Sequence, residues 1–149
     1  MTESADVVLA YWTEHRDQMR QSENQRALLT NYILIIVAAL SGLIVQQQLK
    51  FATLPLSILI IVIGLYGSIT VAKYHERAEY HLVQARALTR ILVTAGALPE
   101  TRDQLNVARE RHNARHPLLH RIRLHMLWTS LHLSVAGYGT LLAVLTLVR

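Results

Sequence analysis

Three long apolar stretches alternate with polar segments along this chain. Residues 27–49 and 51–72 contain no charged side chain, and His132 is the one basic or acidic group within residues 126–148. A bilayer core about 30 Å thick is crossed by about 20 residues of α-helix, and each stretch reaches that length. The pattern therefore predicts three transmembrane helices.

Hydrophobic residues recur at intervals of three and four through and beyond the first two stretches, which is the spacing of one helix face. We expect one helix from near Ser4 to about Gln47 and a second from near Pro55 to Gly96. The predicted buried face of the first helix consists of Val8, Trp12, His15, Met19, Ser22, Arg26, Leu29, Ile33, Ile36, Leu40 and Leu43. That of the second helix consists of Ile60, Gly64, Gly67, Val71, Tyr74, Ala78, His81, Ala85, Leu88 and Leu92.

The expected fold is an all-α membrane protein with three parts. Residues 1–95 form a long-helix transmembrane hairpin, with spans at about 29–48 and 54–72, whose helices extend into the cytosol. Residues 96–116 form a short cytosolic amphipathic helix. Residues 117–149 form a C-terminal helix that begins at Pro117 and contains the third span, at about 126–148.

Basic residues gather on the segments that three crossings would place on one side of a membrane. Of the fifteen Lys and Arg residues, residues 1–26 contain three and residues 73–125 contain ten. The positive-inside rule therefore predicts a multi-pass protein of the inner (cytoplasmic) membrane, with the N-terminus and residues 73–125 in the cytoplasm. The chain has no cysteine, which excludes disulfides, thiolate metal sites and cysteine nucleophiles.

Small residues share faces of the predicted helices, and such faces let membrane helices approach closely. These faces would pack helices within one three-helix unit, or between copies in a homo-oligomer, or both. We expect a homo-oligomer. The helix-packing candidates are Gly64, Gly67, Ala78, Ala85, His132, Ala136 and Gly139.

A polar stripe runs along the first helix and continues as small and apolar residues. In an oligomer it would line a vestibule with acidic rings, followed by an apolar constriction that gates by dewetting. The alternative interpretation of its polar part is an ordinary solvated helix face. The pore-lining candidates are Glu14, Asp17, Gln21, Asn24, Asn31, Ile35, Ala38, Gly42 and Val45.

Arginines after the second span form like-charge pairs four residues apart, an arrangement that destabilises an isolated helix. Nearby carboxylates, lipid headgroups or a phosphate-bearing ligand such as a nucleotide would compensate. The chain has no Gly-rich phosphate loop, so side chains would have to bind such a ligand. We expect no nucleic acid partner. The candidates are Arg77, Arg86, Arg90, Arg109, Arg111 and Arg115.

The spacing of His112, His116 and His120 is one that metal ligands adopt on a helix. Pro117 interrupts that helix, and no carboxylate or cysteine nearby completes a ligand set. We therefore expect no metal and no cofactor.

His132 differs from the other histidines because it lies inside a predicted span, where an ionisable group indicates function. It would act in gating or proton relay, or it would be a neutral histidine hydrogen-bonded to a nearby Ser, Thr or Tyr, such as Ser134 or Tyr66. No paired carboxylates lie in or at the mouth of the membrane portion. We therefore expect no enzymatic activity.

The arrangement of residues 8–92 resembles the SLATT membrane-effector domains of bacterial conflict systems. The resemblance rests on the 31–45 span, the short turn at 46–53, the 55–72 span and the helix that begins Tyr74-His75-Glu76-Arg77. It implies a pore-forming or membrane-disrupting effector, triggered by a partner that senses phage infection, often by making a nucleotide signal. The third span departs from the simplest members of the family, which have two.

Two functions follow as hypotheses. The first is an oligomeric ion channel that acts as an anti-phage effector, with the first helix lining the pore and a partner protein or nucleotide acting on the basic cytosolic region. The second is a membrane-anchored coiled-coil module that recruits a partner and conducts no ions. Membrane lipids are expected partners in both cases.

Overall fold

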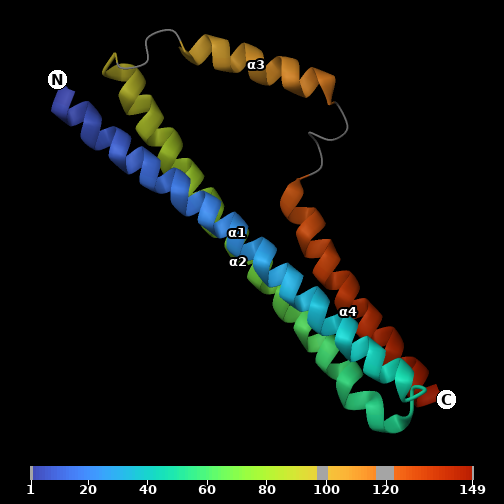
Figure 1. The fold of residues 1–149 in the computed structure, drawn as a ribbon. Helices are drawn as coiled ribbons and strands as arrows, with labels where there is room; N and C mark the ends of the chain where they lie inside the picture. The colour runs from blue at the N-terminus through green and yellow to red at the C-terminus, as the bar shows by residue number, and fades with distance from the viewer. Residues whose placement is uncertain (1, 97–100, 117–122, 149) are drawn as a thin grey trace. The chain divides into compact units, whose positions relative to one another are not determined.

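The computed structural model describes residues 2–96, 101–116 and 123–148, and every regular element in them is helical. In chain order they are α1 (Thr2–Gln46), the short 3-10 helix η1 (Phe51–Thr53), α2 (Leu54–Thr94), α3 (Thr101–Arg115) and α4 (Leu124–Val148) (Figure 1). The predicted helical fold is confirmed. Three of the helices, α1, α2 and α4, are long and apolar enough to cross a membrane.

The ends of these helices follow from local chemistry. After α1, Gln48 and Leu49 adopt left-handed backbone angles (φ 56° and 52°), and this turn joins α1 to η1. Pro55 lies in the first turn of α2, a position that requires no backbone N–H. Gly96 (φ 74°) follows the end of α2, where a left-handed residue favours glycine.

The last helix begins later than the sequence predicts. Residues 117–122 lie outside the described part of the chain, but Arg123 is not helical and α4 starts at Leu124. A cation in the first turn opposes the helix dipole, which favours a start after Arg123.

The chain divides into two compact units, each of which contains part of α1 and part of α2. The first unit comprises Met1–Glu23 and Glu76–Arg123, and the second comprises Asn24–His75 and Leu124–Arg149. The three apolar segments of α1, α2 and α4 therefore belong to the second unit.

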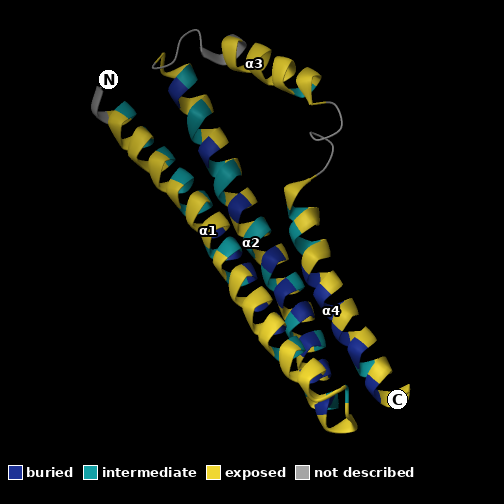
Figure 2. Cartoon of the chain, turned by 45° about the vertical axis from the view of Figure 1, so that its right-hand side comes forward, coloured by how far each residue is buried: buried dark blue, intermediate teal, exposed yellow. Residues whose placement is uncertain are grey.

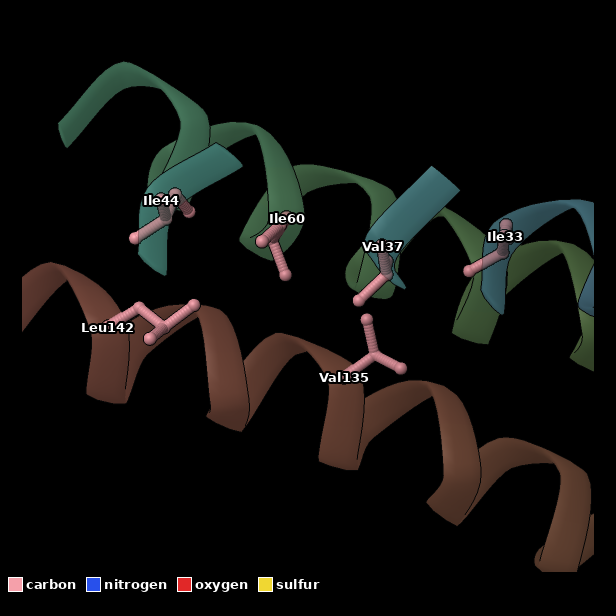
Figure 3. Close-up of a cluster of buried hydrophobic side chains, with 6 residues drawn as sticks. All are labelled: Ile33, Val37, Ile44, Ile60, Val135 and Leu142. Atoms are coloured by element: carbon pink, nitrogen blue, oxygen red, sulfur yellow. The ribbon is translucent and has the colours of Figure 1, made fainter. Parts of the chain in front are cut away.

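The second unit is a three-helix bundle with an apolar core. Figure 2 shows its buried positions as a stripe along α2 and along one side of α4, while much of α1 is exposed. Figure 3 shows core side chains from all three helices converging: Ile33, Val37, Ile44, Ile60, Val135 and Leu142.

The first unit pairs the N-terminal part of α1 with the C-terminal part of α2. Ala78, Ala85 and Leu92 of α2 are buried in this unit. The indole Nε1 of Trp12 donates a hydrogen bond to Thr89 Oγ1 at 3.0 Å, across 77 residues of sequence. Buried apolar residues and interhelical hydrogen bonds therefore hold these two segments together.

The predicted buried face of α2 is confirmed at all ten positions, which are buried or half-buried. The predicted face of α1 is confirmed as far as Ile33, and Leu40 beyond it is half-buried against the core. Beyond Ile33, Val37 and Ile44 are buried, whereas Ile36 and Leu43 are 45% and 49% exposed. In this part of the chain α1 packs against α4 as well as α2, and the buried positions move on by one residue, to Val37 and Ile44.

Candidate membrane site

Helices α2 and α4 pack with their backbones in contact at glycines of the second unit. A Cβ on Gly64 would lie 2.5 Å from the backbone nitrogen and 2.9 Å from the Cα of Ala136. A Cβ on Gly139 would lie 2.8 Å from the backbone nitrogen of Ile61. No larger side chain fits at either position without separating the helices. The packing candidates that belong to this unit, all buried, are Gly64, Gly67, His132, Ala136 and Gly139; Ala78 and Ala85 are buried in the first unit.

His132 is completely buried in the bundle, and its partner comes from α1. Its Nε2 atom lies 3.1 Å from Thr30 Oγ1. The Thr30 hydroxyl donates to the carbonyl oxygen of Arg26 at 3.0 Å, so its one hydrogen is already used. Nε2–H must therefore donate to the Thr30 oxygen, which places the hydrogen of a neutral imidazole on Nε2.

The other ring nitrogen of His132, Nδ1, is buried without a hydrogen-bond partner. It lies against Gly67, where an added Cβ would collide with Nδ1 and come within 2.8 Å of Cε1. The absence of a side chain at Gly67 thus makes room for the imidazole between the helices. The expected contact with a serine, threonine or tyrosine is therefore present, but the partner is Thr30 and neither of the two named examples. Ser134 Oγ donates to the carbonyl of Ser130, and Tyr66 is 60% exposed.

One face of α1 remains open in the single chain. All nine pore-lining candidates, Glu14, Asp17, Gln21, Asn24, Asn31, Ile35, Ala38, Gly42 and Val45, are exposed. Within the second unit we name residues Asn31, Ile35, Ala38, Gly42 and Val45 the open face of α1. A Cβ on Gly42 would meet nothing within 4 Å, and the Asn31 amide has no hydrogen-bond partner among the described residues.

A cation and aromatic rings gather at one end of the second unit, which we name the Arg26 rim. Arg26 is only 5% exposed, and its guanidinium carbon lies 5.3 Å from the centre of the Trp128 ring. The imidazoles of His75 and His125 stack with their centres 4.0 Å apart.

Comparison of the chain with protein-family models, curated proteins and solved structures found no match. The geometry therefore carries the functional argument.

Sequence reasoning missed Arg26, Thr30 and Trp128 as site residues. A signal was present, because Arg26 and Thr30 are four residues apart and therefore share a helix face. Arg26 directly precedes the first apolar stretch and Thr30 is its fourth residue, and a polar residue on a buried face there needs a partner.

The arginine candidates Arg77, Arg86, Arg90, Arg109, Arg111 and Arg115 are all exposed, and they belong to the first unit. Arg77 donates to Gln18 Oε1 at 3.2 Å, which links α2 to α1. The last three are carried by α3. Their exposure leaves the guanidinium groups accessible to an anion.

A histidine pair joins the two helices of the first unit. The Nδ1 atoms of His15 and His81 lie 3.0 Å apart, so they share one hydrogen. Partial burial is the main cause that lowers the pKa of His81 below its ordinary value. The neighbouring His15 and Arg77 lower this pKa further, and Glu14 opposes them.

The rings of His112 and His116 lie with their centres 5.0 Å apart, and His120 is outside the described residues. Within the described ranges, no three His, Asp or Glu side chains come together as a metal site would require.

Proposed function

We propose that the protein assembles in a membrane as a homo-oligomer and conducts ions through a gated pore lined by the open face of α1. One observation carries the proposal: the amide of Asn31 is exposed within an apolar span and has no partner in the described chain. An amide that faces hydrocarbon without a hydrogen bond costs about 2–7 kcal/mol. Pore water or a neighbouring subunit would remove that cost.

The rest of the open face fits a pore wall. Ile35, Ala38 and Val45 would form an apolar constriction, which can gate by dewetting. Glu14 and Asp17, further along α1 towards the N-terminus, would place acidic rings at the pore mouth and favour cations. Only 22% of the most apolar stretch of α1 is buried, against 39% for α4, so α1 has more surface available to other copies.

The orientation that we propose places the N-terminus and residues 73–125 in the cytoplasm. The distribution of Lys and Arg supports it. All ten carboxylates also lie within residues 3–23 and 76–110, so no acidic side chain would have to cross the inner membrane.

The resemblance to SLATT domains supports the further proposal of an effector role in bacterial defence against phage. A partner protein or a nucleotide would open the pore by binding the exposed arginines of the first unit, among them Arg86, Arg90 and Arg109. In this scheme the signal acts on one unit and ions cross the other.

The decisive test compares two leucine substitutions at adjacent residues of α1. Ala38 belongs to the open face, and Ala39, also exposed, points about 100° away around the helix. We expect Ala38→Leu and Asn31→Leu to abolish ion flux in liposomes containing the purified protein, and Ala39→Leu to conduct as the wild type does. Native mass spectrometry would check that each variant still assembles. Equal flux in Ala38→Leu and Ala39→Leu would remove this face from the pore wall.

A second candidate function is a membrane-anchored interaction module. An exposed stripe on α2 in the first unit favours it, because Tyr80, Val83, Ala87 and Ile91 follow one another at intervals of three or four residues, share a helix face and are all exposed. This function predicts a stable assembly that does not conduct, and in which Val83→Glu breaks the association.

A further inference from the structure

The Arg26 rim contains hydrogen-bond donors that have no acceptor. Both Nε of Arg26 and Nε1 of Trp128 are buried without a partner. These N–H groups can only donate. A buried donor left without an acceptor costs about 1–3 kcal/mol, so an acceptor that reaches these groups after a small side-chain rotation would stabilise the rim.

The charge of Arg26 is also not neutralised within its own unit. Residues 24–75 and 124–149 contain no Asp or Glu at all. The Trp128 ring, 5.3 Å away, offers a cation–π contact, which is worth about 0.5–2 kcal/mol and adds no negative charge. A buried cation usually has an anionic partner. The second unit contains no carboxylate side chain that could serve as that partner.

The rim lies at the boundary between apolar and polar sequence on all three helices. Arg26 directly precedes the uncharged stretch 27–49, Lys73 directly follows the stretch 51–72, and His125 directly precedes the stretch 126–148. Tryptophan and arginine at such boundaries lie at the level of lipid headgroups. Phospholipid phosphates occupy the same level, and basic pockets between transmembrane helices bind them.

We propose that the Arg26 rim binds the phosphate of an anionic phospholipid. The guanidinium fork would bind two phosphate oxygens, and Trp128 Nε1–H would donate to a third. Because the backbone carbonyl of Arg26 accepts from Thr30, which in turn contacts His132, the bound lipid would also steady the packing of α1 on α4. The site does not depend on ion conduction.

The experiment measures lipid retention by the purified full-length chain. Native mass spectrometry would titrate phosphatidylglycerol against phosphatidylcholine for the wild type, Arg26→Gln and Arg20→Gln. Arg20 is an exposed cation of the first unit, so its loss is the matched control for charge. A basic residue near a membrane surface contributes about 1 kcal/mol, so we expect Arg26→Gln to weaken phosphatidylglycerol binding about fivefold or more. Arg20→Gln should bind as the wild type does.

Two further arms keep the result decisive. Trp128→Phe keeps an aromatic ring at this position but removes the N–H together with part of the indole, so it tests the site if Arg26→Gln fails to fold. We expect a smaller loss of phosphatidylglycerol preference. Inorganic phosphate, titrated against bound phosphatidylglycerol, should not displace it. Wild-type retention in both rim variants, an equal loss in Arg20→Gln, or displacement by inorganic phosphate would overturn the proposal.

Discussion

Replacement of Gly64 by alanine tests whether α2 and α4 meet backbone to backbone. The new methyl group would lie 2.9 Å from the Cα of Ala136 and 2.9 Å from the carbonyl oxygen of His132. Carbon atoms in favourable contact lie about 3.5–4.0 Å apart, so the helices must separate by about 0.6 Å or more. Both obstructing atoms belong to the α4 backbone, which cannot move aside as a side chain can.

The energetic cost follows from this separation. A gap of about 0.5–1 Å removes about a quarter to a half of the dispersion attraction between the atoms that it parts. Overpacking of a tight interface typically costs about 1–3 kcal/mol. Gly137 provides the matched control on α4, because a Cβ there would meet nothing within 4 Å. Both substitutions share the helix-propensity gain of about 1 kcal/mol, so Gly64→Ala should be about 1–3 kcal/mol less stable than Gly137→Ala.

The assay is reversible unfolding in mixed micelles of a mild detergent and sodium dodecyl sulfate, followed by helical circular dichroism. Gly137→Ala should unfold at a higher dodecyl sulfate fraction than the wild type, and Gly64→Ala at a lower one. If the two variants unfold at the same fraction, the close approach of α2 and α4 at Gly64 is wrong.

Two other predictions concern the buried polar pair and the histidine pair. Thr30→Val removes the partner of His132 Nε2 and should reduce the free energy of unfolding by about 1–3 kcal/mol. Thr30→Ser keeps the hydroxyl and should reduce the free energy of unfolding by less. Similar reductions in both variants would show that the hydroxyl does not contribute to stability. The lowered pKa of His81 means that the unfolded chain takes up a proton first as the pH falls. The contribution of His81 to the stability of the α1–α2 pairing in the first unit should therefore be complete above about pH 6.5. This contribution should decrease as the pH falls from there towards the folded-state pKa of His81. Trp12 fluorescence in a Trp128→Phe background would follow this decrease, and His81→Gln should flatten the profile; an unchanged slope would exclude His81 as its cause.

The sequence predicts the helices because their signal is local. Apolar length, Pro55 and Gly96 are visible in the residues themselves, and the buried face of α2 keeps one spacing from Ile60 to Leu92. On α1 the prediction fails at Ile36 and Leu43, because α4 adds a second neighbour there and the sequence of α1 alone does not show where it packs.

The buried polar pair shows why partners are harder to predict than faces. The sequence identifies His132 as unusual, but Thr30 lies 102 residues away, on a helix whose rotation relative to α4 depends on packing. The contact of His132 with Gly67 depends in the same way on which turn of α2 meets which turn of α4. The spacing of residues along a single helix predicts neither the Thr30–His132 contact nor the Gly67–His132 contact.

The turn between α1 and α2 has a consequence for how this protein enters a membrane. The backbone N–H groups of Gln47, Gln48, Leu49, Lys50 and Thr53 all donate to carbonyl oxygens within the turn or the end of α1, at 2.8–3.3 Å. In hydrocarbon each unsatisfied backbone group costs several kcal/mol, so a loop that satisfies most of its own N–H groups lowers the barrier to its translocation. In the orientation that we propose, Lys50 is the one charged side chain of the turn, and it would cross with it. The first two spans would then insert together as a helical hairpin.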